Sequence, residues 1–222
     1  TTLFRSDFAR RRLRCHLQKY YRKHGNNGYI LLIDFSKYYD NVLHSIAFDQ
    51  LVRHTTDHKE VMVLVDIVDS FKVGLDSLPS DLKAYKYDST KFYEKHPNGD
   101  KYLRKSVPIG DQTSQVIGIY YPYRLDNYCK IVKGLKFYGR YMDDIYVMHE
   151  SKEYLKEVLD EIRTEAGKLG IFLNEDKTQI CRIDKPFHFL QNSYCLTDTG
   201  RIIERINKKR VVRMRRKLKK LA

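Results

Sequence analysis

An uninterrupted apolar run at residues 29–33 ends directly at an acid, Asp34. Such a run is typical of a buried strand, and a helical pattern at 7–24 precedes it, separated by a Gly- and Asn-rich breaker at 25–28. A carboxylate at the end of a buried strand is costly unless a partner neutralises it. The chain is therefore expected to fold around a buried strand that ends at the carboxylate of Asp34.

Strand-like and helix-like segments alternate along the rest of the chain, so we expect an α+β fold in one continuous unit. The predicted helices cover residues 43–53, 60–71, 113–132 with a kink at Pro122, and 152–169 between an N-cap at Ser151 and Gly170. The predicted strands cover 136–141, 145–149, 171–173, 178–181 and 187–190, with a hairpin around 198–200 and a surface hairpin or extended loop at 74–105.

Positive charge is concentrated at the two ends of the chain. The net charge is +14, of which residues 1–24 contribute +7 and residues 207–222 contribute +9, so the residues between them sum to −2. Two basic ends on a nearly neutral body favour a polyanionic partner, with nucleic acid first and an anionic membrane surface second.

Several classes of protein are excluded by what the sequence lacks. No apolar stretch reaches the roughly 18 residues of a membrane span, and no signal-peptide core is present at the N-terminus. The 4 cysteines have neither paired spacing nor nearby histidines, so no disulfide framework or zinc site is indicated. We expect a soluble, cytoplasmic protein with reduced thiols and no membrane partner.

Two adjacent carboxylates, Asp143 and Asp144, lie at a tight turn between two short predicted strands. Taken alone, this pair fits an exposed turn without function equally well. Asp34 changes the balance, because carboxylates converging from two neighbouring strands form a hard-oxygen site suited to two Mg²⁺ ions.

Five ordered segments resemble the motifs of reverse transcriptases. They are residues 30–40 (ILLIDFSKYYD, motif A), 108–115 (PIGDQTSQ, motif B), 141–144 (YMDD, motif C), 169–178 (motif D) and 187–191 (FHFLQ, the primer-grip motif E). The resemblance implies a polymerase palm, an antiparallel sheet with helices packed on one face, at 29–206. It also implies residual fingers and a helix leading into the palm at 1–28, and the start of a thumb or connector at 207–222.

The resemblance also assigns the catalytic positions. Asp34, Asp143, Asp144 and the backbone carbonyl of Phe35 would bind two Mg²⁺ ions, for which Mn²⁺ could substitute. Lys177 would lie near the leaving pyrophosphate as a proton donor.

Substrate-binding positions follow from the same motifs. Tyr39 falls where the family has an aromatic steric gate that excludes a 2′-hydroxyl and so selects deoxynucleotides. The other implied substrate positions are Phe35, Ile109, Gly110, Ser114, Gln115, Tyr141 and Met142. On the C-terminal helix, the residues expected to contact nucleic acid are Arg210, Arg213, Arg216, Lys217 and Lys220.

The function implied is RNA-directed DNA synthesis for a bacterial or phage retroelement of the group II intron or diversity-generating kind. The partners would be an RNA template, a DNA or RNA primer and dNTPs. Motif B carries Ile109 where many relatives have Gln and Ser114-Gln115 where many have Ser-Pro, which predicts error-prone copying. Two alternatives stay open: an RNA-binding palm module of the intron maturase kind with little or no synthesis, and an RNA polymerase with a palm.

Only 33 residues precede Asp34, which leaves little room for the fingers hairpin that the family places before motif A. A fragment, a minimal natural form and one piece of a split assembly all fit this arrangement. An accessory protein or separate fingers and thumb segments are therefore further expected partners.

Overall fold

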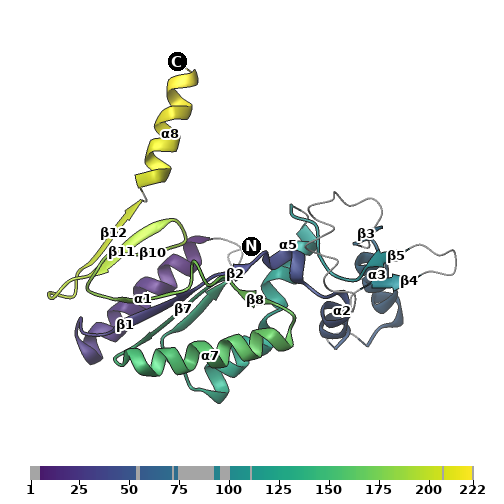
Figure 1. The fold of residues 1–222 in the computed structure, drawn as a ribbon, viewed down its shortest axis with the longest axis horizontal. Coiled ribbons are helices and arrows are strands. Elements are labelled where there is room, and N and C mark those ends of the chain that lie inside the picture. The colour runs from purple at the N-terminus through teal and green to yellow at the C-terminus, as the bar shows by residue number, and fades with distance from the viewer. Residues whose placement is uncertain are drawn as a thin grey trace. The chain divides into compact units, whose positions relative to one another are not determined.

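The computed structural model describes residues 6–53, 56–71, 73–74, 93–95, 101–110, 112–206 and 208–221. The chain forms two compact units (Figure 1). The first unit contains 1–35, 126–163 and 173–222, and the second contains 36–125 and 164–172. Each unit is considered by itself below.

The first unit is built on a four-stranded antiparallel sheet. Its strands lie in the order β6 (Tyr138–Tyr141), β7 (Asp144–His149), β1 (Tyr29–Ile33) and β9 (Gln179–Arg182). The apolar run at 29–33 occupies a central strand, flanked by β7 and β9, and its residues 30–33 are at most 5% exposed. Because the side chains of a strand alternate between faces, a run of this kind is buried on both faces of the sheet.

Helix α1 (Ser6–His24) covers one of these faces. Its apolar residues recur at helical spacing, and they pack with Ile30 and Leu32 of β1 and with Tyr146 and Met148 of β7. The same cluster takes in side chains from a three-stranded antiparallel sheet of β10 (Phe187–Phe189), β11 (Asn192–Leu196) and β12 (Ile202–Ile206). Each large apolar side chain buried here contributes on the order of 1.5 to 3 kcal/mol, so this cluster stabilises the first unit.

Helix α7 (Lys152–Lys168) begins and ends where the sequence predicts. The backbone N–H of Tyr154 donates to Ser151 Oγ over 3.0 Å, which confirms the predicted N-cap. Gly170 ends the turn that follows the helix. Its φ of +71° lies in the left-handed region, which glycine tolerates. The last helix, α8 (Lys208–Leu221), confirms the predicted C-terminal helix.

In the second unit, the predicted helix at 113–132 is interrupted. It divides into α5 (Gln112–Tyr120), α6 (Tyr123–Asn127) and the π-helix η4 (Tyr128–Val132), the last two running on into the first unit. The break falls at Pro122, whose ring removes a backbone donor. The expected kink is therefore a complete interruption between two helices.

The other elements of the second unit are short. They are η1 (Tyr38–Asn41), α2 (His44–Val52), α3 (His58–Asp69), and a small antiparallel sheet in the order β3 (Val73–Gly74), β5 (Lys101–Leu103) and β4 (Tyr93–Lys95). Strand β2 (Phe35–Ser36) pairs with β8 (Phe172–Leu173). Most of the segment 74–105, predicted as a surface hairpin or loop, lies outside the described residues. Among the helices described, none has the length and apolar character needed to cross a bilayer.

Tyr121 connects three segments of the second unit. Its hydroxyl donates to the carbonyl of Leu169 over 2.6 Å and accepts the backbone N–H of Leu43 over 3.1 Å, and its own carbonyl accepts from Gln50. The side chain is 1% exposed, so water cannot replace these partners.

Replacing Tyr121 with Phe should lower the free energy of unfolding by roughly 1 to 3 kcal/mol, because a buried N–H and a buried carbonyl lose their partner. Chemical denaturation would measure the change. Tyr123→Phe is the matched control, since the Tyr123 hydroxyl accepts from the exposed Arg124 and water can replace it. Equal stability of the two variants would contradict this account of Tyr121.

Candidate functional site

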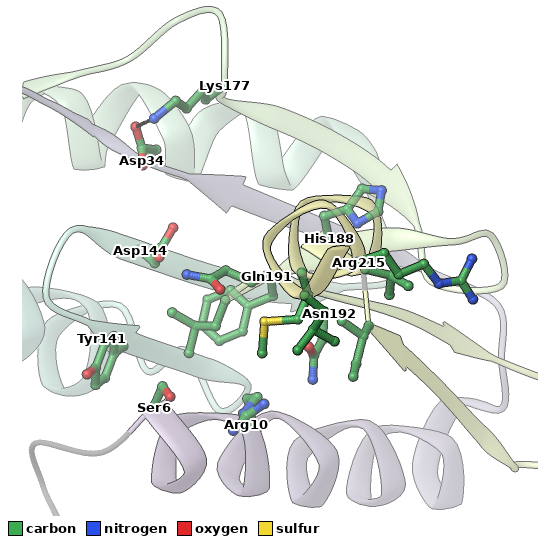
Figure 2. Close-up of a pocket in the computed structure, with 16 residues that line it drawn as sticks. Ser6, Arg10, Asp34, Tyr141, Asp144, Lys177, His188, Gln191, Asn192 and Arg215 are labelled. Carbon is green, nitrogen blue, oxygen red and sulfur yellow. Dashed lines mark hydrogen bonds and ion pairs between the residues drawn. The ribbon is translucent and has the colours of Figure 1, made fainter. Parts of the chain in front are cut away.

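Three carboxylates lie at one end of the sheet in the first unit (Figure 2 shows two of them). Ile33 of β1 pairs with Ile145 of β7, so Asp34, the next residue along β1, falls beside Asp144, the first residue of β7. Asp143 precedes Asp144 in the loop that joins β6 to β7. The strand register, rather than any long loop, thus brings acids more than a hundred residues apart to the same edge.

A strained two-residue loop carries Asp143. Tyr141 pairs with Asp144, and between them Met142 has φ of +54°, a left-handed conformation that non-glycine residues rarely adopt. The guanidinium of Arg140 donates to the Met142 carbonyl over 2.9 Å and forms an ion pair with Asp126 at 2.6 Å. Arg140 therefore ties the loop to Asp126. The side chain of Arg140 is only 7% exposed, so water competes little for these bonds.

Asp34 is held by the turn between β8 and β9. Its Oδ2 accepts from Lys177 Nζ at 2.8 Å and from Asn174 Nδ2 at 3.3 Å, and its backbone carbonyl accepts the Asn174 N–H at 2.8 Å. Figure 2 shows the Lys177 ammonium directed at the Asp34 carboxylate. The sequence placed Lys177 in this region by resemblance but gave no signal for Asn174.

Burial and mutual repulsion disfavour the charged forms of these acids. Burial, followed by the charges of Asp143 and Asp34, raises the pKa of Asp144 to about 7, and the Lys177 ammonium opposes the rise. Burial also raises the pKa of Asp143, with Asp34 adding to the effect. The hydrogen bond to Asp34 raises the pKa of Lys177. The site therefore holds more negative charge than one lysine neutralises.

This excess charge fits a divalent cation. The groups available are carboxylate oxygens, which Mg²⁺ prefers, and a cation among them would relieve the repulsion that raises the pKa of Asp144. Within the described residues, however, no three His, Cys, Asp or Glu side chains stand together at metal-binding spacing. The donors thus have the right chemistry, but Asp34 is turned toward Lys177 and would have to rotate to share an ion with the other two.

A cavity of about 1190 Å³ opens beside these acids. Asp34, Asp144 and Lys177 line one part of it, and the hairpin loop between β10 and β11 lines another. That loop has two consecutive left-handed residues, Leu190 with φ of +47° and Gln191 with φ of +69°. Loops of this kind favour Asn and Gly, so Leu-Gln is strained here, and strain of this kind is concentrated at functional sites.

Basic side chains also line the cavity, and sequence reasoning did not select them. Arg10 comes from α1 and Arg215 from α8 (Figure 2). Val211, Met214 and Leu218 of α8 add apolar side chains to the lining. Of the residues predicted on α8 to contact nucleic acid, Arg213, Arg216 and Lys217 are exposed, whereas the side chains of Arg210 and Lys220 lie outside the described ones. The helical spacing of Met214 and Leu218 could have indicated which neighbouring arginine faces the cavity.

The comparisons with known proteins decide the family. The family model described as reverse transcriptase (RNA-dependent DNA polymerase) matches residues 3–191. The chain belongs to the reverse transcriptase family. A search of curated protein sequences finds no match to the chain.

Solved telomerase structures share the fold. The telomerase of Candida albicans, in complex with a TWJ fragment of telomeric RNA, matches 91% of this chain with a TM-score of 0.57 at 15% identity. The apo telomerase of Candida tropicalis matches 90% with a TM-score of 0.55 at 17% identity. The chain spans 34% and 36% of those two chains, about a third of their length. These likenesses confirm the predicted palm, with mixed helices and antiparallel sheets.

The reverse transcriptase motif B positions belong to the second unit. Ile109 is 84% exposed, and Gly110 has φ of +108° with open space around its Cα. Ser114 is fully buried on α5, and its Oγ has no partner among the described residues. Gln115 is half-buried, as is Tyr39 of motif A. Asp111 lies outside the described residues.

The charge of Asp144 should make this reverse transcriptase domain less stable as pH rises. Burial raises the pKa of Asp144 from 3.8 in the unfolded chain to about 7 in the folded one, so the stability that its protonated form contributes is full below pH 3.8, falls as the pH rises between these two values, and is gone above about pH 7. In EDTA at pH 8, Asp144→Asn should therefore raise the free energy of unfolding by roughly 2 to 4 kcal/mol. Near pH 4 the difference should vanish.

Urea denaturation across this pH range would measure the effect. The matched control is Glu157→Gln, which neutralises an exposed carboxylate on α7. A destabilised Asp144→Asn variant at pH 8 would show that the Asp144 charge is already compensated.

Proposed function

We propose that this chain carries the catalytic centre of an RNA-directed DNA polymerase. The observation that supports this most strongly is the pairing of β1 with β7, which puts Asp34 beside Asp144 in a half-buried, mutually repelling group of acids. A protein that only bound nucleic acid would gain nothing from acids held near phosphate, because they repel it. Membership of the reverse transcriptase family supports the same proposal.

In this proposal Asp34, Asp143 and Asp144, with the backbone carbonyl of Phe35, would hold two Mg²⁺ ions, or Mn²⁺ in their place. When bound, such ions would supply electrostatic stabilisation of the charge that develops in phosphoryl transfer. The loop anchored by Arg140 fixes the direction of Asp143, and Asn174 fixes the backbone of Asp34. Tyr141 and Met142 form the backbone of the loop that carries Asp143. The left-handed φ of Met142 is an unfavourable conformation that this loop requires.

Lys177 has a second role in the proposal. Its ammonium lies 2.8 Å from Asp34, and in the proposal Lys177 would donate a proton to a leaving pyrophosphate beside these acids. Its side chain is 63% exposed, which leaves it room to reorient.

The cavity beside the acids is proposed to receive the primer end of the template–primer duplex. The strained Leu190-Gln191 loop lies on one wall, and Arg10 and Arg215 supply positive charge for phosphate. In the second unit, Tyr39 is proposed to select dNTPs, and Gly110, Ser114 and Gln115 to shape the nucleotide and template side. The exposed residues Arg213, Arg216 and Lys217 of α8 would contact the backbone of the duplex.

A retroelement of the group II intron or diversity-generating kind remains the proposed setting, with RNA as template and DNA or RNA as primer. The feature that supports this setting is motif B, where an aliphatic side chain precedes Gly110. Ile109 is 84% exposed, so it adds little to the core and is available to a template or nucleotide. Because it cannot hydrogen-bond, it is proposed to relax the discrimination between correct and incorrect pairs.

An RNA-binding module of the maturase kind is the second candidate function. The observation in its favour is that Asp34 is bonded to Lys177 and that no set of three donors at metal-binding spacing occurs in the described part of the chain. Such a module would bind RNA through its basic helices and would not extend a primer.

Asp143→Asn separates these two functions. On a primed RNA template with Mg²⁺ and dNTPs, the variant should lose at least about a hundredfold in incorporation rate, because an ion ligand is removed. Its affinity for the template–primer should be equal to or higher than that of wild type, since a negative charge near phosphate has gone.

Asp66→Asn, on the exposed face of α3, is the control and should leave incorporation unchanged. Incorporation by Asp143→Asn at the wild-type rate would refute the catalytic assignment. Template binding without incorporation by wild type would favour the binding module.

Ile109→Gln tests the proposed fidelity. The variant should misincorporate opposite template A several-fold less often than wild type, because an amide can hydrogen-bond where an aliphatic side chain cannot. Sequencing of products made by both proteins on one RNA template would measure this. Identical error spectra would remove error-prone copying from the proposal.

A further inference from the structure

Gly118 is a glycine in the interior of a helix, where it costs about 1 kcal/mol relative to alanine. It lies in α5, and its backbone does not have the left-handed conformation that would require glycine. A helix that keeps glycine at such a position usually does so because another group needs the space.

The group that occupies this space is the ring of Tyr39. A Cβ on Gly118 would lie 2.9 Å from the Tyr39 hydroxyl oxygen and 3.1 Å from two carbons of its ring. Contacts this short are tighter than nearly all contacts that a Cβ makes, so the ring would have to shift. The ring thus rests directly on the backbone of α5.

Neighbouring contacts fix the same arrangement. The Tyr38 hydroxyl donates to the Gly118 carbonyl over 2.6 Å, and the rings of Tyr38 and Tyr39 meet edge to face with centroids 5.4 Å apart. The backbone carbonyl of Tyr39 accepts the N–H of Val107 over 3.0 Å. Because the ring rests on the backbone of α5, it can yield to a new Cβ only by moving away from that helix.

We infer that Gly118 is a positioning residue that sets how far the Tyr39 ring projects into the nucleotide site. This inference rests on the proposed function, in which Tyr39 selects the sugar. A gate of this kind discriminates by steric exclusion, so a displacement of a few tenths of an ångström changes which sugars fit. Alanine at position 118 would displace the ring away from α5 and so change the space that a sugar beside the ring can occupy.

The test compares Gly118→Ala with Gly167→Ala in primer extension by the whole chain. Gly167 lies in α7, and a Cβ there would meet nothing within 4 Å, so this variant has the same gain in helix propensity without the clash. Gly118→Ala should raise KM for dNTP about five- to tenfold with little change in kcat, and should lower rNTP use at least as much. Gly167→Ala should match wild type. Thermal unfolding of both variants would show that they are folded.

Substitutions of Tyr39 show whether the effect passes through the ring. In a Tyr39→Ala background, Gly118→Ala should no longer change KM. In a Tyr39→Phe background its effect should be smaller than in wild type, because the hydroxyl oxygen is the nearest atom to the new Cβ.

The inference is overturned if Gly118→Ala and Gly167→Ala have equal KM values, or if Gly118→Ala has the same effect with Ala at position 39. Failure of the proposed function looks different. In that case wild type and Gly167→Ala would both fail to incorporate nucleotides, whereas failure of the inference alone leaves incorporation intact.

Discussion

Repulsion among three half-buried carboxylates is the constraint on which the site depends. The central sheet causes it, because the pairing of Ile33 with Ile145 places the backbones of Asp34 and Asp144 side by side. The protein balances this repulsion only in part, through the Lys177 ammonium. A cluster that remains short of positive charge is disfavoured without a ligand and is correspondingly well suited to bind one.

The loops around the acids include residues in unfavourable backbone conformations. Met142 in one hairpin loop and Leu190 and Gln191 in another have left-handed φ values, each of which costs on the order of 1 kcal/mol or more. Both loops adjoin the cavity or the acids, whereas the core formed by α1 and the central sheet is regular and well buried. Among the described residues of the first unit, left-handed non-glycine residues therefore occur only in the part that is proposed to act on substrate, and the regular core offsets their cost.

Local sequence patterns predicted much of the fold. The apolar run at 29–33 predicted a buried strand, and the spacing of apolar residues together with Ser151 and Gly170 predicted α7 and its ends. These features depend on neighbours in sequence, which is why they could be predicted. Pro122 was identified as a disturbance, but a single proline does not reveal whether a helix bends or stops.

The contacts that organise the site could not be predicted in this way. Asn174 and Lys177 meet Asp34 only because β9 pairs with β1, and the sequence gives no register for that pair. Arg140 and Asp126 are 14 residues apart on different elements, so no periodicity links them. The motif resemblance identified which residues should matter, whereas the structure shows what holds them and that Asp34 is turned toward Lys177.

Binding of Mn²⁺ to the whole chain, followed by calorimetry near pH 7, tests most directly whether the three carboxylates act as one ion site. The account predicts saturable binding with release of a proton from Asp144, whose pKa is about 7, and a loss of at least about tenfold in affinity for Asp34→Asn. Mn²⁺ affinity and proton release that are unchanged by Asp34→Asn would contradict it.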